Sequence, residues 1–360
     1  MLDLEKDLDL DERSHVDFVA NLRKAWANTV FPALYDDVTV SGLPVASLKQ
    51  AKTAVRQSVI YPWFSHLERQ QQKMLWRTMS DAVLRRRSAL RDLLEVENPQ
   101  NSMLEIDDSF ELPQWYVDTD IHIQPGSFFL DDASAFIYEL GARVVMLRDN
   151  DGYKFHRLFA ATALPDIPDA KRVVDVGCGF GKSTQVLPAK YPVAEVIGVD
   201  LSVPNLRLAH AQSEEKGSKI HWKLASSFET GLESGSADLV TGTMVLHEMP
   251  KAQIEATLRE AARLLRPGGV LRFLEFWPTG DHLRDITVYE HAERNNEPYF
   301  RDLFDTDAVA VLESAGIPGA EWVSFDEREV GLTPGGRIPR REWHFPWAVL
   351  SATKPESIES

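Results

Sequence analysis

Cysteine is almost absent from this chain, since Cys178 is the single one among 360 residues. One cysteine excludes an intramolecular disulfide and a metal site built only from cysteine ligands, and it fits a reducing cytoplasm. Histidine occurs ten times, but no two histidines stand three or four positions apart and no H-E-x-x-H segment is present. The sequence therefore predicts no metal site and gives no support to a metal-dependent mechanism.

Long apolar runs and excess positive charge are also lacking. No stretch reaches the ~18 consecutive apolar residues of a membrane-spanning helix. The opening segment MLDLEKDLDLDERSH is acidic, whereas a secretory signal begins with basic residues. The formal net charge is -16 at pH 7, and nonspecific binding to nucleic acid depends on clustered lysine and arginine. We therefore expect a cytoplasmic protein with no membrane and no nucleic-acid partner.

The composition that is present, 44% hydrophobic and 26% charged, is that of an ordinary globular protein. Residues 1–165 show mainly helical patterns, beginning with apolar positions spaced by three and four over residues 16–34. A second apolar stripe follows Pro62, and we expect Ser65 and Glu68 to form a capping box at its start. The sequence predicts a helical extension in front of the rest of the chain.

Two segments interrupt the helical pattern. VENPQNSMLEIDDSFELPQ, residues 96–114, is rich in Asn, Pro and acidic residues and is expected to be a loop. From Trp115 the chain is dense in aromatic residues up to a helix that we expect to begin near Asp131. Aromatic density usually means packing, but a segment directly before a ligand-binding unit is also well placed to cover its crevice.

Beyond residue 170, short apolar runs alternate with helical stretches, which is typical of a parallel sheet covered on both faces. The predicted strands are RVVDVG, EVIGVD, KIHWKLA, ADLVTGTMV, VLRFLEF, AEWVSFDE and HFPWAVLSATK. The connection between the last two contains Gly and Pro and suits an antiparallel pair.

The glycine-rich stretch VVDVGCGFGKST, residues 173–184, combines parts of several nucleotide loops. A phosphate-binding P-loop ending in Gly-Lys-Ser needs glycine where Val176 stands. The dinucleotide fingerprint needs glycine or alanine where Lys182 stands, which disfavours an NAD oxidoreductase. What remains is D-x-G-x-G-x-G, which begins at Asp175.

Together with Asp200 at the end of the next strand, this pattern resembles the class I S-adenosylmethionine-dependent methyltransferases. SADLVTGTMVLHEMP is similar to the fourth-strand motif of that family, and REAARLLRPGGVLRFLEF to its helix, turn and fifth strand. The resemblance covers roughly residues 165–353 and is strongest to the UbiE-like small-molecule branch. It implies an α/β fold, a Rossmann-like seven-stranded methyltransferase sheet with a helical N-terminal extension.

The resemblance also implies the residues that bind the cofactor, S-adenosyl-L-methionine. Asp175 offers a carboxylate to the positively charged sulfonium and amino groups, and Asp200 accepts hydrogen bonds from the ribose hydroxyls. Ser226 and Ser227 stand where many relatives carry an Asp-Ala pair against the adenine, so Phe228 is expected to contribute by packing. The full predicted set is Asp175, Gly177, Cys178, Gly179, Gly181, Asp200, Leu201, Ser226, Ser227, Phe228 and Thr243.

Methyl transfer is an in-line displacement that requires a general base only when the acceptor must lose a proton. His247, which follows the fourth strand of the core, is the leading candidate, although it could equally serve only to close the strand end. Glu275 and Glu248 are further candidates at the same edge. The insertion at about residues 277–304 is expected to contact the acceptor, chiefly through Asn296 and Tyr299; His291, Asn295 and Glu297 also lie in this insertion.

The sequence thus divides into residues 1–165, a helical extension or lid, residues 166–354, the cofactor-binding core, and residues 355–360, a flexible tail. The predicted activity is methyl transfer to a small molecule, with a possible homodimer formed through the N-terminal helices. Two alternatives use the same motifs: an enzyme that uses the aminocarboxypropyl arm of the cofactor, and a non-catalytic protein that binds it.

Overall fold

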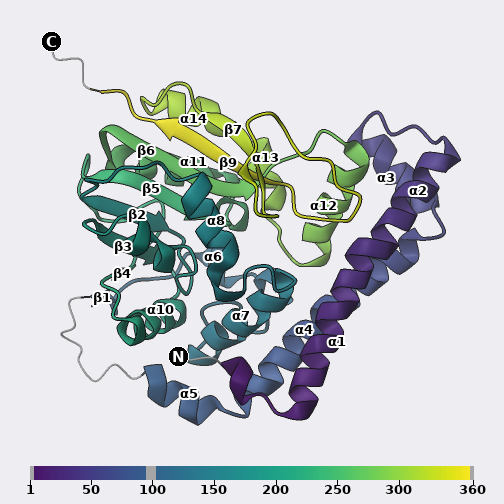
Figure 1. Ribbon diagram of the computed structural model, residues 1–360, viewed down its shortest axis with the longest axis horizontal. Coiled ribbons are helices and arrows are strands. Elements are labelled where there is room, and N and C mark those ends of the chain that lie inside the picture. The colour runs from purple at the N-terminus through teal and green to yellow at the C-terminus, as the bar shows by residue number, and fades with distance from the viewer. Residues whose placement is uncertain (1–3, 95–102, 357–360) are drawn as a thin grey trace.

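The computed structural model describes residues 4–94 and 103–356 (Figure 1). Within these residues a single sheet runs in the order β1-β4-β3-β2-β5-β6-β9-β7-β8. Its strands are β1 (Leu104–Glu105), β2 (Arg172–Val176), β3 (Glu195–Asp200), β4 (His221–Leu224), β5 (Ala237–Thr243), β6 (Leu265–Phe276), β7 (Glu321–Asp326), β8 (Gly331–Leu332) and β9 (Trp347–Thr353).

Eight helices precede β2, and six more follow it in the described residues. The first group is α1 (Leu10–Ala25), α2 (Phe31–Ser41), α3 (Leu48–Gln57), α4 (Tyr61–Leu84), α5 (Arg87–Leu94), α6 (Gln114–Val117), α7 (Asp132–Val145) and α8 (Lys154–Thr162). The second group is α9 (Leu187–Lys190), α10 (Val203–Lys216), α11 (Lys251–Leu264), α12 (His282–Arg294), α13 (Phe300–Asp305) and α14 (Ala308–Ser314).

The central strands are parallel from β4 to β6. Helices return the chain after β2, β3 and β5, whereas residues 225–236 connect β4 to β5 without a helix. β9 is antiparallel to both β6 and β7, so the predicted antiparallel pair at the end of the chain is confirmed. All seven predicted strands are present, and the Rossmann-like α/β fold is confirmed. The predicted number of strands is too low, because the short strands β1 and β8 extend the two edges and bring the sheet to nine strands. No described helix combines the length and the apolar character needed to cross a bilayer.

The extension is not purely helical, because β1 lies inside the stretch predicted to be a loop. Leu104 and Glu105 pair in parallel with Trp222 and Lys223 of β4 and form an edge of the sheet. Two residues are too few to show the alternation that marks a strand in a sequence. Residues 95–102 of the same stretch, like residues 357–360 of the predicted tail, lie outside the described residues.

The N-terminal helices form a long layer beside the sheet. Figure 1 shows α1 and α4 side by side, with α7 between them and the sheet. Leu75, Met79 and Val83 of α4 are fully buried and share a core with Phe136 and Leu140 of α7. The apolar stripes predicted from sequence are therefore packing surfaces between helices.

The predicted capping box at Ser65 and Glu68 is wrong. α4 begins at Tyr61, with Pro62 in its first turn, so both residues lie inside the helix. The Glu68 carboxylate instead accepts hydrogen bonds from His291 Nδ1, at 2.5 Å, and from the guanidinium of Arg294. Glu68 is 1% exposed, so this contact is a buried ionic link between α4 and α12.

We predict that Glu68→Gln lowers the free energy of unfolding by about 3 kcal/mol, because it leaves the Arg294 charge buried with a weaker partner. Glu293→Gln on α12 removes an exposed carboxylate that pairs with Arg301, so it should cost at most about 1 kcal/mol. Urea denaturation of the two variants measures the difference. Equal effects would show that Glu68 contributes no more than a surface ion pair.

Candidate functional site

A pocket opens at the carboxyl ends of β2, β3 and β5, the edge at which open α/β sheets bind ligands. We call it the glycine-loop pocket. It is lined by Trp115, Tyr116, Ile121, Phe128, Tyr138, Gly177, Gly179, Asp200, Leu201, Asn205, Ala225, Ser227, Phe228, Met244, Val245, Glu248 and Met249.

The glycines after β2 let the backbone pass where a side chain has no room. Gly177 has φ +65° and a Cβ added there would lie 2.1 Å from Val245. Gly181 has φ +88° and its Cβ would lie 2.6 Å from the Trp222 ring. Gly179, with φ +52°, lies on the pocket wall itself. The alternating glycines therefore build a turn whose backbone faces a ligand directly.

Asp200 ends β3 and reaches the pocket with a carboxylate held by backbone donors. Its Oδ2 accepts from Gly179 N at 2.7 Å, and its Oδ1 accepts from Ser202 N at 2.8 Å. Burial raises the pKa of Asp200 to about 6, although these donors act in the opposite direction. Each carboxylate oxygen keeps acceptor capacity for a diol in the pocket.

Asp175 lies beneath the glycine turn and does not line the pocket. Its Oδ2 accepts hydrogen bonds from Ser183 Oγ at 2.6 Å and Thr184 Oγ1 at 2.7 Å. Its Oδ1 is buried without a partner among the described residues, and burial raises the pKa of this carboxyl to about 6. Asp175 thus holds the two ends of the turn together, and Oδ1 is the atom left over for a donor from a ligand or water.

The remaining predicted cofactor residues divide into two groups. Leu201, Ser227 and Phe228 line the pocket with the residues described above. Four others lie beside the pocket but do not line it: Cys178, Gly181, Ser226 and Thr243. Ser227 Oγ is 2.8 Å from Thr257 Oγ1, so one of its hydrogen bonds is already used inside the protein.

The aromatic segment before α7 covers this pocket, as its position in the sequence suggested. Trp115, Tyr116 and Phe128 of this segment line the pocket wall, beside Tyr138 of α7. The Ser202 hydroxyl donates to the Phe128 carbonyl, which fastens the segment to the start of α10. His122, with φ +58°, is one of several non-glycine residues there in the left-handed region. Such strain persists only where the surrounding structure enforces it.

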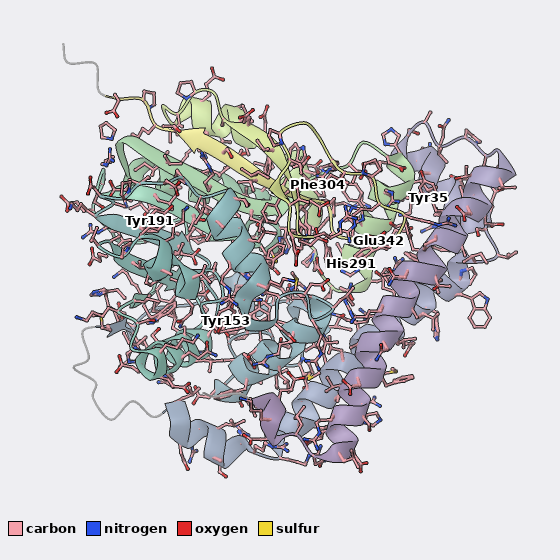
Figure 2. All side chains as sticks on the ribbon, viewed as in Figure 1. Tyr35, Tyr153, Tyr191, His291, Phe304 and Glu342 are labelled. Atoms are coloured by element: carbon pink, nitrogen blue, oxygen red, sulfur yellow. The ribbon has the colours of Figure 1, made fainter. Side chains whose placement is uncertain are left out.

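A second space adjoins the first and shares Tyr138, Met244 and Glu248 with it. We call it the histidine chamber. Its other walls come from α1, α4, α7, the glycine loop, β6, α12 and the C-terminal segment, and are formed by Arg23, Gln72, Trp76, His122, Ala142, Val145, Met146, Lys182, His247, Phe276, His291, Glu297, Phe345 and Trp347. Figure 2 shows His291 where α12 meets the N-terminal helices.

A chain of alternating carboxylates and imidazoles runs along the chamber. His247 Nδ1 lies 2.7 Å from Glu275 Oε2, and His247 Nε2 lies 3.4 Å from Glu248 Oε1. Glu248 Oε1 is also 2.9 Å from His122 Nε2, whose Nδ1 is 3.0 Å from Glu297 Oε1. The chain joins the end of β5 to the aromatic segment through Glu248.

The carboxylates and imidazoles in this row shift the pKa values of their neighbours. Burial alone would lower the pKa of His247, but the carboxylates of Glu275 and Glu248 outweigh it and raise that pKa well above its usual value. Burial would likewise raise the pKa of Glu248, yet the neighbouring imidazoles of His122 and His247 hold it well below the usual range. Glu275 accepts from Val245 N and Leu246 N, both at 2.5 Å, so it also fixes the turn that carries His247.

Met244 joins the two spaces and was not predicted from sequence. It directly follows Thr243, the last residue of β5, and adopts φ +55°, which is unusual for a residue with a Cβ. Its side chain therefore leaves the regular strand direction and borders both spaces. The predicted strand ADLVTGTMV included Met244, so nothing in the sequence indicated that the strand would end at Thr243.

The two residues predicted to bind the acceptor lie elsewhere. Asn296 Nδ2 donates to the Asp120 carbonyl at 2.8 Å, and the Tyr299 hydroxyl donates to the Trp115 carbonyl at 3.3 Å. Neither lines the chamber, so in this structure both fasten the aromatic segment to the insertion. His291 and Glu297 of the same insertion do line it, whereas Asn295 lies behind and contacts the His291 ring.

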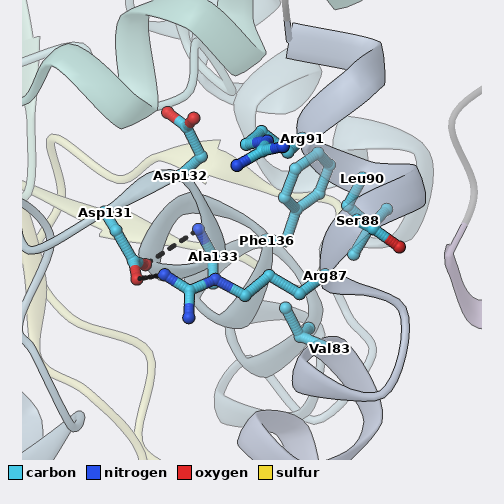
Figure 3. Close-up of a pocket in the computed structure, with 9 residues that line it drawn as sticks. All are labelled: Val83, Arg87, Ser88, Leu90, Arg91, Asp131, Asp132, Ala133 and Phe136. Carbon is cyan, nitrogen blue, oxygen red and sulfur yellow. Dashed lines mark hydrogen bonds and ion pairs between the residues drawn. The ribbon is translucent and has the colours of Figure 1, made fainter.

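Another hollow lies between α5 and α7 and is shown in Figure 3. Arg87 forms an ion pair with Asp131 there, at 2.7 Å, and Asp131 Oδ1 also accepts from Ala133 N. Asp131 caps α7 at the position predicted from sequence. These polar groups serve the helix end and do not converge on a ligand. Across the described residues, no three His, Cys, Asp or Glu side chains are arranged to hold a metal ion.

Comparison with known proteins finds one family match, to the family described as Methyltransferase domain, over residues 173–269. Over 108 residues the chain is 33% identical to the demethylmenaquinone methyltransferase of Thermus thermophilus, covering 30% of this chain and 48% of that protein. Over 106 residues it is 37% identical to the trans-aconitate 2-methyltransferase of an Azoarcus species, covering 29% and 39%. The chain thus spans less than half the length of these two relatives.

Among solved structures, the chain is similar to the phosphoethanolamine N-methyltransferase 2 of Haemonchus contortus in complex with S-adenosyl-L-methionine. The TM-score is 0.46 at 12% identity, and the overlap covers 70% of this chain and 62% of that one.

The histidine chain predicts a pH-dependent stability. Burial lowers the pKa of His122, but Glu248 and Glu297 outweigh it and raise that pKa from 6.5 to about 10. A pKa raised on folding stabilises the protein fully below pH 6.5, and the contribution is lost as the pH rises to about 10. The melting temperature of His122→Gln should therefore lie below that of the parent at pH 6, and the gap should close towards pH 10.

A gap that stays constant from pH 6 to 10 would contradict this account of His122. His66→Gln provides the control, since His66 is exposed on α4 and should show no gap at either pH.

Proposed function

We propose, from the premise that residues 173–269 form a class I S-adenosylmethionine-dependent methyltransferase domain, that this protein transfers a methyl group to a small-molecule acceptor. The observation that carries the proposal is the junction of two spaces at Tyr138, Met244 and Glu248. One space has the glycine turn and Asp200 on its wall, and the other has His247. A cofactor in the first space would thus face an acceptor in the second.

The residues present fit the cofactor. Gly177 and Gly179 present backbone without a Cβ on the pocket wall, where a ligand can approach closely. Asp200 offers two acceptor oxygens for a ribose diol, and Asp175 Oδ1 is a buried acceptor without a partner. Phe228 and Leu201 supply apolar wall beside them. S-adenosyl-L-methionine supplies the electrophilic methyl carbon when it is bound.

The residues of the chain then have separable roles. The chamber walls orient the acceptor so that its nucleophilic atom points at the glycine-loop pocket, which is the main source of acceleration for a displacement reaction. Glu275 holds Nδ1 of His247, and Nε2, which lies 3.4 Å from Glu248 Oε1, is the atom that accepts a proton from the acceptor when the imidazole is neutral. The aromatic segment excludes water from both spaces.

We also propose that the protein is cytoplasmic and that it forms a homodimer through its N-terminal helices. Phe18 of α1 and Trp63 of α4 are largely exposed apolar side chains on this layer. Light scattering during size-exclusion chromatography tests the dimer, and a monomeric mass at micromolar concentration would overturn it.

The activity is tested by mass spectrometry of products formed from S-adenosylmethionine and a small-molecule extract. We expect S-adenosylhomocysteine together with an extract compound heavier by one methylene group. Methylthioadenosine formed above the level of a no-protein sample would show that the aminocarboxypropyl arm is transferred instead.

For the cofactor site, we predict that Asp200→Asn weakens binding of S-adenosylhomocysteine by about 1.5–3 kcal/mol, because charge-assisted hydrogen bonds are lost. The parent should also bind more weakly below pH 6, since the pKa of Asp200 is about 6 and the ionised form is the better acceptor. Calorimetric titration measures both effects, with exposed Asp118→Asn as the control. If binding to Asp200→Asn still weakens below pH 6, the titrating group is Asp175 and not Asp200.

For the base, we predict that His247→Gln lowers kcat by roughly 10²–10⁴-fold while binding of S-adenosylhomocysteine is unchanged. The raised pKa of His247 means that its neutral, proton-accepting form increases with pH. The kcat of the parent should therefore rise towards alkaline pH, and the variant should lack this rise. Full activity of His247→Gln would leave His247 with a purely structural role.

A further inference from the structure

Arg23 of α1 is a buried cation with no carboxylate partner among the described residues. Arg23 is 6% exposed, and its Nη1 donates a hydrogen bond to Gln72 Oε1 at 2.8 Å. Nε is buried and has no hydrogen-bond partner in the described parts of the chain. Burial lowers the pKa of Arg23 to about 10, although the charge of Glu68 acts in the opposite direction. Buried guanidinium groups are normally paired, so this one needs an explanation.

The carboxylates near Arg23 are already committed to other groups. Glu68 accepts from His291 and Arg294. Glu297 and Glu248, which line the chamber, both contact His122. None of the three forms an ion pair with Arg23 in the part of the chain that the structure describes. Arg23 lines the chamber and also a neighbouring hollow with Asp149 and Glu327, and Glu327 is already paired with Arg340.

Lys182 brings a second cation to the same space. Its Nζ lies 5.0 Å from the centre of the Tyr138 ring and 5.1 Å from that of Phe180. Burial lowers the pKa of Lys182 to about 8, with Glu139 acting in the opposite direction. Arg23 and Lys182 thus both line the chamber, in a chain whose formal net charge is -16.

The walls between these cations and His247 are largely aromatic. Trp76, Phe276, Phe345 and Trp347 line the chamber, and Phe276 and Trp347 stack with ring centres 4.6 Å apart. Aromatic walls suit a planar or apolar body, and a planar guanidinium fork suits a carboxylate or phosphate. The two features occur together on the walls of the histidine chamber.

We propose that the chamber selects an anionic acceptor: a small molecule with an apolar, ring-sized body and a carboxylate or phosphate group that binds Arg23, assisted by Lys182. That the bound anion is the methyl acceptor rests on the proposed function, whereas the anion site itself is defined by the residues that line the chamber. Gln72 positions the guanidinium, since it accepts from Arg23 and its Nε2 donates to the His122 carbonyl at 3.3 Å. Arg23 is thus a specificity-determining residue that lies apart from the glycine-loop pocket.

The test uses the full-length protein saturated with S-adenosylhomocysteine, so that the glycine-loop pocket is filled. Three probes of similar size are titrated: benzoate, phenyl phosphate and the neutral benzyl alcohol. Quenching of tryptophan fluorescence reports binding, because Trp76 and Trp347 line the chamber. We expect benzoate or phenyl phosphate to bind at least about ten-fold more tightly than benzyl alcohol, since an ion pair supported by hydrogen bonds is gained. Which of the two binds better distinguishes a carboxylate from a phosphate acceptor.

Two variants assign the anion site to Arg23. Arg23→Met should lose the preference for the anions, and its melting temperature without probes should equal or exceed that of the parent, because an uncompensated buried charge is removed. Arg13→Met, on the exposed face of the same helix, should keep the preference. Arg23→Lys retains the charge and should recover part of the preference, which keeps the test usable if Arg23→Met does not fold.

Equal affinity of all three probes for the parent would overturn the proposal, as would an unchanged preference in Arg23→Met. A strong fall in melting temperature of a folded Arg23→Met would also count against it, because the guanidinium would then serve the fold. If instead the proposed function is wrong and the anion site is right, calorimetry would show no binding of S-adenosylhomocysteine, while the parent would still bind the anions more tightly than benzyl alcohol.

Discussion

The structure depends above all on the position of Glu248 between two imidazoles. His122 belongs to the aromatic segment and His247 to the turn after β5, so this single carboxylate joins the cover to the core. Glu248 remains ionised in a buried place because both neighbours favour its charge, and they in turn remain protonated because of it. Both the glycine-loop pocket and the histidine chamber have this residue on their walls. A change in the charge of Glu248 would therefore alter the walls of both spaces and the contact that holds the aromatic segment.

Two further buried carboxylates, those of Glu275 and Glu68, are likewise surrounded by positive charges or hydrogen-bond donors. Glu275 is fully buried and holds His247 together with two backbone amides. Glu68 connects α4 to α12 through Arg294. The large cost of burying these charges is met by placing opposite charges and hydrogen bonds around each one. Arg23 is the exception in this set, and for that reason it is the residue that most directly indicates a ligand.

The fold could be predicted from the sequence because each strand of the core is a strong apolar run and each connection has clear turn residues. The glycine turn and Asp200 could be predicted because their spacing is fixed by backbone geometry. The chamber could not, since Arg23, Trp76 and His122 come from helices and loops far apart in sequence and meet only after the extension packs on the core. Asn296 and Tyr299 looked like ligand contacts because polar and aromatic groups clustered there, but their partners are backbone carbonyls of the cover. Local sequence carries no information about which of two such partners a side chain meets.

The short strand β1 restricts how ligands can enter. It joins the extension to the sheet by pairing with β4. Further along the chain, α7 begins at its N-cap residue, Asp131. The chain between these two anchors includes the aromatic segment, which is tied down by Ser202, Asn296 and Tyr299. The aromatic segment is thus attached to the sheet side at one end and to α7 at the other, so any opening of this cover would have to break these hydrogen bonds while both ends stay in place.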